Sequence, residues 1–111
     1  MQKYWTVTNA TWSAAINLST AINKDFRLDS ITIHFDVAPT TSENLTVTID
    51  SWLGIEYDVV LFTIDPSSSS VTDIVFIPDS HLALDEWDQI LVEYTNTDTA
   101  TYGVRIMTQT L

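Results

Sequence analysis

Apolar and polar residues alternate along several short stretches of this chain. The clearest stretch is residues 31–37, in which every second residue is apolar, and residues 45–50 repeat the pattern. A period of two residues is that of a β-strand with one face in the core and the other in water. Pro39 and the Thr40-Thr41-Ser42 run that follows it separate the two stretches, as expected for a turn. The alternation therefore predicts β-strands joined by short loops.

The rest of the chain repeats this unit at intervals of about ten residues. We expect a more fully buried strand at 57–64, further strands at 71–77, 90–94 and 102–106, and two short strands at 4–8 and 12–18. The sequence has seventeen threonines and only two glycines, and β-branched residues favour pleated strands. We predict an all-β fold, an antiparallel β-sandwich of about eight short strands with jelly-roll topology. The alternative is an up-and-down barrel.

The length of 111 residues predicts a single domain, because a chain of this size can build one hydrophobic core but not two. Residues 28–111 carry the clear alternation and form the body of the predicted sandwich. Residues 1–27 have a weaker pattern, and we interpret them as an N-terminal segment with short strands and as a candidate docking region. The chain has no cysteine, so neither a disulfide nor a thiolate metal site is available.

Charge is distributed very unevenly. No lysine or arginine occurs between Arg27 and Arg105, and fourteen of the fifteen acidic residues lie in that interval. The formal net charge of −11 argues against nucleic acid and anionic membrane as partners, since both would be repelled. A basic protein surface or a divalent cation would be attracted. Three of the four basic residues, Lys3, Lys24 and Arg27, precede the acidic body.

Catalytic patterns are missing from the sequence. It has no Gly-x-Ser-x-Gly elbow and no glycine-rich phosphate loop, and neither His34 nor His81 lies in a distinctive context. The acidic turns at 85–88 and 50–58 could supply oxygen ligands to calcium, but they lack the spacing of an EF-hand loop and also fit solvated turns. We therefore expect a non-enzymatic protein with no catalytic residues, no metal site and no cofactor.

Two phrases in the sequence carry a resemblance to known proteins. Residues 82–92, Leu-Ala-Leu-Asp-Glu-Trp-Asp-Gln-Ile-Leu-Val, resemble a turn-and-strand phrase of jelly-roll domains, Leu-x-Leu-x-x-Gly-Asp-x-Ile-x-Val, with Trp87 in place of the glycine. Residues 28–106 as a whole, including Leu28–His34, Thr41–Ser51, Tyr57–Leu61, Asp65-Pro66-Ser67, Asn96-Thr97-Asp98 and Tyr102-Gly103, are similar to small β-sandwich virion proteins of tailed bacteriophages. Such proteins serve as capsid decoration subunits, head fibres or tail accessory modules.

The resemblance implies a virion structural protein, made in the host cytoplasm and placed on the outer surface of the phage head. Its partners would be the major capsid protein and further copies of itself, with a trimer expected. Together with the charge asymmetry, it predicts a docking surface at the N-terminal side, made of Lys3, Tyr4, Trp5, Trp12, Lys24 and Arg27. The alternative is a carbohydrate-binding or receptor-binding module of a phage tail or fibre. Its stacking platforms would be Trp52, Tyr57, Trp87 and Tyr102, since aromatic rings near turns suit half-wet sites.

Overall fold

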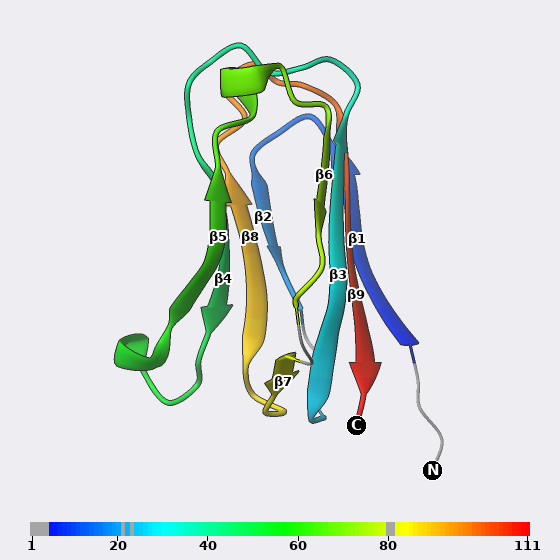
Figure 1. Cartoon of the computed structure of the whole chain (residues 1–111), viewed down its shortest axis with the longest axis vertical. Helices are drawn as coiled ribbons and strands as arrows, with labels where there is room; N and C mark the ends of the chain where they lie inside the picture. Colours follow the sequence, from blue (N-terminus) through cyan, green and yellow to red (C-terminus); the bar gives the residue numbers. More distant parts are fainter. Residues whose placement is uncertain (1–4, 21, 23, 80–81) are drawn as a thin grey trace.

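A computed structural model describes residues 5–20, 22, 24–79 and 82–111, with backbone only for residues 5–12. Two antiparallel sheets pack face to face as a β-sandwich (Figure 1). The strands are β1 (Trp5–Trp12), β2 (Ile16–Ser19), β3 (Phe26–Phe35), β4 (Leu45–Asp50), β5 (Val59–Ile64), β6 (Asp73–Phe76), β7 (Leu82–Leu84), β8 (Gln89–Tyr94) and β9 (Tyr102–Thr110). Short 3₁₀ turns lie at η1 (Ile55–Tyr57) and η2 (Pro66–Ser69). This confirms the all-β sandwich predicted from the alternation.

The strand order is that of a jelly roll. One sheet runs β1-β9-β3-β6, with β7 also paired to β3, and the other runs β2-β8-β4-β5. Strand β6 pairs with Ile31–His34 of β3 and β7 with Phe26–Leu28, so β6 and β7 are two parts of one interrupted edge strand. With that pair counted once, β1 lies beside β9, β2 beside β8, β3 beside β6 and β7, and β4 beside β5. This nested pairing of first with last strands defines the jelly roll.

The core lies between the sheets and is built from the alternating residues. Ile31, Ile33 and Phe35 of β3 are at most 2% exposed, and the facing residues of β4 and β8 are equally buried. The ring of Phe35 meets that of Tyr94 edge-on, with centroids 5.6 Å apart. Burying side chains of this size stabilises the fold by roughly 1.5–3 kcal/mol each, so the period-two pattern determines which face of each strand is inside.

Three predictions about individual strands are wrong. Residues 57–64 are not a fully buried strand: β5 is an edge strand, and Val59 and Val60 at its start are exposed. The two short strands expected at 4–8 and 12–18 are instead one strand, β1, and the four-residue β2. Val37 does not continue β3, which ends at Phe35, and its side chain is exposed. For β5 the reason is its position, because an edge strand has a neighbour on one side only.

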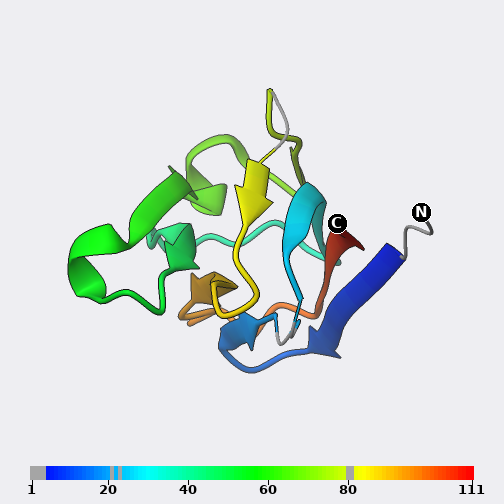
Figure 2. The same ribbon diagram turned by 90° about the horizontal axis from the view of Figure 1, so that it is seen from below.

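The strands run along the long axis of the molecule, so the loops gather at two ends (Figure 1). We call the end with loops 13–15, 36–44, 65–72 and 95–101 the upper end. The lower end carries loop 51–58, turn 85–88 and the C-terminus. Seen from below, loop 51–58 and the start of β5 project beyond the body of the sandwich (Figure 2).

Candidate interaction surface at the lower end

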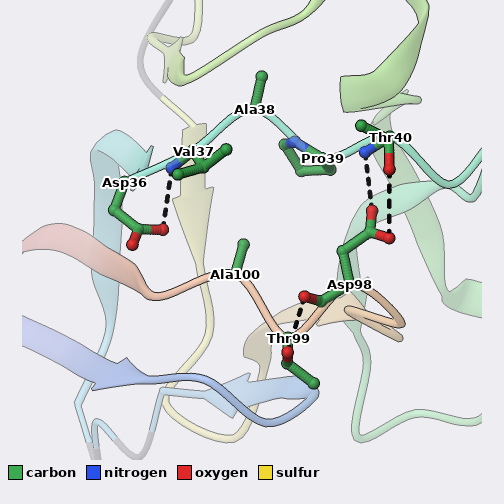
Figure 3. Close-up of a pocket in the computed structure, with 8 residues that line it drawn as sticks. All are labelled: Asp36, Val37, Ala38, Pro39, Thr40, Asp98, Thr99 and Ala100. Atoms are coloured by element: carbon green, nitrogen blue, oxygen red, sulfur yellow. Dashed lines mark hydrogen bonds between the residues drawn. The ribbon is translucent and has the colours of Figure 1, made fainter.

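Carboxylates join the loops of the upper end to one another. Asp98, in loop 95–101, accepts hydrogen bonds from the backbone N–H groups of Thr40 and Thr41 at 2.7 and 2.8 Å. Its other oxygen accepts from the two threonine hydroxyls, at 3.4 Å from Thr40 and 2.7 Å from Thr41 (Figure 3 shows the Thr40 contacts). These bonds hold the pKa of the Asp98 carboxyl below its ordinary value, the Thr41 N–H having the largest effect. Asp98 thus fixes loop 36–44 against loop 95–101.

Asn96 completes the closure of the upper end from inside. It is 3% exposed and has a positive φ of 56°. Its amide Nδ2 donates to the carbonyls of Ser13, Ala14 and Ala100, and its Oδ1 accepts from the Ala100 N–H. Asn tolerates the left-handed conformation better than other non-glycine residues. A single buried side chain therefore ties loop 13–15 to loop 95–101.

A hollow of about 410 Å³ lies in the upper end, lined by residues 36–40 and 98–100 (Figure 3). Both oxygens of the Asp98 carboxylate in this hollow already accept bonds from Thr40 and Thr41. Asp36 bonds the N–H groups of Val37 and Thr101 through one oxygen. No aromatic ring lines the hollow. Its polar groups hold loops together, and it lacks the convergent free groups of a ligand site.

The lower end has the opposite character. Among the described residues, eleven large apolar side chains are exposed, and six of them lie within ten consecutive positions. They are Trp52, Leu53, Ile55, Tyr57, Val59 and Val60. We call residues 51–60 the wing. Ile55, at its tip, is 82% exposed. Clusters of exposed apolar side chains on a soluble domain mark interaction surfaces, so the wing is the candidate functional site.

The wing is held in shape by its own hydrogen bonds. Asp58 accepts from the N–H of Ser51 at 2.8 Å and so closes the loop at its base. The Tyr57 N–H donates to the Gly54 carbonyl and the Asp58 N–H to the Ile55 carbonyl, forming η1. Gly54 has φ 134° and ψ 167°, a conformation that is nearly restricted to glycine. The apolar side chains are thus presented on a preformed loop rather than on a random one.

The wing continues into the free edge of a sheet. Within the described chain, β5 pairs only with β4, so its other edge carries unpaired backbone groups. The stacked rings of Phe62 and Phe76, 4.8 Å apart, close the sandwich between β5 and β6. Below them a hollow of about 230 Å³ opens between Leu61 and the residues that follow β6. Acidic residues Asp50 and Glu56 flank the apolar side chains and are exposed.

The predicted N-terminal docking residues do not form one cluster. Trp5 and Trp12 are the first and last residues of the eight-residue β1, so their backbones lie roughly 20 Å apart. Trp5 is paired with Gln109 at the lower end and Trp12 with Tyr102 at the upper end. Lys24 is exposed near the start of β3. Lys3 and Tyr4 lie outside the described residues.

Arg27 lies on β3 and is engaged by a neighbour. Its Nε donates to the carboxylate of Asp29 at 3.1 Å, and both side chains are 20% exposed. Strand β1 itself pairs along its length with β9. The described part of segment 1–27 contains β1 and β2, each an edge strand of one of the two sheets, and the start of β3. Deleting it would remove an edge strand from both sheets. Point substitutions are the appropriate way to test docking there.

The aromatic residues predicted as sugar platforms divide into two groups. Trp52, Tyr57 and Trp87 are all more than half exposed, the first two on the wing and the third in turn 85–88. Tyr102 is only 4% exposed, and its hydroxyl donates to the Ala15 carbonyl. Its ring is part of the core and has no free face for a sugar, so this assignment is wrong. Tyr102 shares the apolar face of its strand with Val104 and Ile106, so the alternation itself places this ring in the core.

Two carboxylates accept backbone hydrogen bonds at turn 85–88, one of the two acidic turns considered for calcium. Asp88 accepts from the Asp85 N–H, and Asp25 accepts from the Glu86 N–H. Within the described residues, no three His, Cys, Asp or Glu side chains gather closely enough to hold a metal ion. His34 forms an exposed pair with Asp73 at 2.6 Å across β3 and β6, and His81 lies outside the described residues. Asp85 and Glu86 of the first acidic turn, and Asp50 and Glu56 of the second, are exposed.

Four of the six exposed apolar side chains of the wing were not predicted from the sequence as a surface: Leu53, Ile55, Val59 and Val60. The signal was present as a break in the alternation, because residues 51–60 place several large apolar residues around a glycine instead of one at every second position.

The sequence matches no family model and no curated protein. No helix long and apolar enough to cross a bilayer occurs in the part of the chain that the structure describes.

Proposed function

We propose that this protein is a non-enzymatic structural subunit of a tailed-phage virion that decorates the outer surface of the head by binding the major capsid protein. The observation that carries the proposal is the wing, a preformed apolar surface on an otherwise strongly acidic jelly roll. The resemblance of residues 28–106 to phage virion proteins supplies the setting. Binding to the assembled shell would stabilise it, because a ligand that binds only the assembled state shifts the equilibrium toward that state.

The charge distribution supports an adhesive role over a catalytic one. The acidic surface favours solubility, while the wing offers apolar surface that becomes buried on docking. Exposed carboxylates beside the wing attract a basic surface and raise the rate of association. The upper end has its loops bonded to each other, which leaves few polar groups free for chemistry.

Co-sedimentation with undecorated heads of the phage that encodes the protein tests this proposal. We expect saturable binding at symmetry-related capsid positions, visible when the pelleted heads are imaged. Light scattering of the free protein measures its oligomeric state, for which we expect a trimer. Absence from heads, together with localisation at the tail tip in imaged virions, would contradict the decoration role.

A carbohydrate-binding module of a phage tail or fibre is the second candidate, favoured by one specific observation. Trp52, Tyr57 and Trp87 all expose their rings at the lower end, and exposed aromatic rings can stack on sugars. A glycan array probed with the purified protein distinguishes the two functions. Binding that is lost in Trp87→Ala but retained in Ile55→Ser would favour the sugar site, while a flat array with folded protein would exclude it.

A further inference from the structure

We infer that the free edge of β5 and the adjoining wing form an acceptor site for an extended segment of a partner protein, one with apolar residues flanked by lysine or arginine. The segment would add to the sheet as a strand beside β5 while its apolar side chains pack on the wing. This inference rests on the proposed adhesive function and specifies the mode of binding and the chemistry of the partner.

The edge of β5 has only one of the usual protections against strand addition, a single β-bulge. Edge strands of soluble proteins are typically short, or carry lysine, proline or inward-pointing charges. Strand β5 has six residues, Val-Val-Leu-Phe-Thr-Ile, with none of these. The other edges of the two sheets include β2 and β6, with four residues each, and β7, with three. A bulge opposite Val47 and Thr48 twists β5 locally but leaves residues on both sides available.

Exposed side chains provide the second part of the site. Val59 and Val60 open the strand, and Ile55 and Tyr57 precede them on the wing. Strand addition obtains affinity from backbone hydrogen bonds and specificity from contacts with alternate side chains. A free edge next to an apolar surface provides both, whereas a free edge on a polar face would provide only the first.

The charges around β5 determine which kind of partner segment can bind there. Asp58 precedes β5 and Asp65 follows it, while Asp50 adjoins the wing and Glu56 lies within it. A second copy of this acidic chain would bring like charges together, so the favoured occupant is basic at both ends. Strand β1 is a longer edge, with eight residues, but no acidic residue lies within it or directly beside it. Charge complementarity therefore assigns the partner segment to β5.

Selection from a yeast-displayed library of random peptides, with the purified full-length protein as bait, tests the inference without knowledge of the partner. We expect enriched peptides to carry apolar residues flanked by Lys or Arg. Val60→Lys and Ile55→Ser should each weaken binding of a selected peptide by roughly tenfold or more, as for truncation of central contacts. The matched control Val75→Lys changes an equally exposed valine on an edge strand of the other sheet and should alter affinity by less than about twofold.

A second pair of variants isolates the charge. Glu56→Gln removes a carboxylate of the wing. Glu93→Gln removes an exposed carboxylate from β8, a central strand of the sheet that contains β5. Only Glu56→Gln should reduce the salt dependence of peptide binding. Circular dichroism and thermal melting establish that all five variants are folded before their binding is compared.

Each outcome has a definite meaning. The absence of enriched peptides, enrichment of acidic ones, or binding that is indifferent to Val60→Lys and Ile55→Ser would overturn the inference. A dimer of the free protein that Val60→Lys abolishes would assign the edge to a second copy and also overturn it. If heads are bound equally by wild type and both wing variants, the decoration role stands and the acceptor site falls. If peptides bind as expected but heads do not, the acceptor site stands and the decoration role falls.

Discussion

Asp and Asn side chains bond the loops at the upper end of the sandwich, and an Asp side chain closes the wing at the lower end, but the sequence separation of the bonded residues differs. At the upper end, Asp98 and Asn96 bond residues that lie 57 and 83 positions away in the chain, so that loops distant in sequence hold each other. In the wing, Asp58 bonds Ser51, only seven positions away, and the loop closes on itself, whereas turn 85–88 at the same end is bonded to Asp25, 61 positions from Glu86. Long-range bonds make an end part of the folded unit, while local bonds make a loop that keeps its shape and leaves its side chains free. The wing therefore leaves its apolar side chains accessible to solvent, while the bonds of the upper end hold its loops together.

The largest effect should come from the upper end. Asn96→Ala removes four hydrogen bonds, two of them buried and two partly buried, and places alanine at a positive φ. We expect the free energy of unfolding to fall by roughly 2–4 kcal/mol, because buried partners are left unsatisfied. Chemical denaturation measures this change. Asn44→Ala, at an exposed asparagine of the same end, is the control, and similar losses in both variants would refute the special role of Asn96.

Acid should weaken the upper end next. The pKa of Asp98 is lowered by its bonds from Thr41 and Thr40, and that of Asp65 by bonds from Ser42 and Ser67. Because the folded pKa lies below the unfolded value, the stabilisation is complete above about pH 4 and is lost as the pH falls through the lowered folded pKa.

Unfolding curves between neutral pH and strong acid, for wild type and Asp98→Asn, measure this dependence. Asp98→Asn should be less stable at neutral pH and should lose less stability on acidification. Asp50→Asn removes the same charge at the lower end and serves as the control. Equal changes in the two variants would attribute the effect to net charge instead of to the loop bonds.

Alkaline pH provides a smaller test of the same end. Burial, with the nearby carboxylates of Glu43, Asp98 and Asp65 adding to it, raises the pKa of Tyr94 from 10.0 to about 12. A raised folded pKa means that the stabilisation is complete below about pH 10 and is lost as the pH rises toward the folded value.

The variant Tyr94→Phe should remove this alkaline loss. Its stability at neutral pH should change by no more than about 1 kcal/mol, since the Tyr94 hydroxyl lies near the Glu43 carboxylate but is within hydrogen-bond distance of no partner among the described residues. Thermal melts at neutral pH and above pH 10 measure both effects. A strongly destabilised Tyr94→Phe would show that the hydroxyl has a stabilising contact after all.

The smallest effects on stability should come from the wing. Asp58→Ala opens its base and should speed amide hydrogen exchange in residues 51–58 while leaving the core strands protected. Ile55→Ser should change the free energy of unfolding by less than about 0.5 kcal/mol, because the side chain is already in water. Exchange mass spectrometry and denaturation measure these outcomes. A global loss of protection in Asp58→Ala would mean that the wing supports the sandwich.

The fold was largely predictable from the sequence because its signal is local. The alternation at residues 31–37 and 45–50 identifies strands and their buried faces without knowledge of the partners. The phrase at 82–92 predicted a turn followed by a strand, and β7, turn 85–88 and β8 occupy those residues. The candidate site was only partly predictable. Trp52, Tyr57 and Trp87 were singled out as exposed aromatics, but Val59 and Val60 were assigned to the interior.

The residue composition, the two-residue alternation and the turn residues can be identified from the sequence, and they are sufficient to predict an antiparallel sandwich with an acidic surface. Which strands lie at the edges was decided only by the tertiary structure. An apolar run such as Val59–Ile64 reads the same whether sheets cover it or water does, since burial depends on the neighbours that the topology supplies. The jelly-roll topology places β5 at an edge of its sheet, and the wing projects from the body of the sandwich next to it (Figure 2). That placement turned core-like residues into a surface for contact.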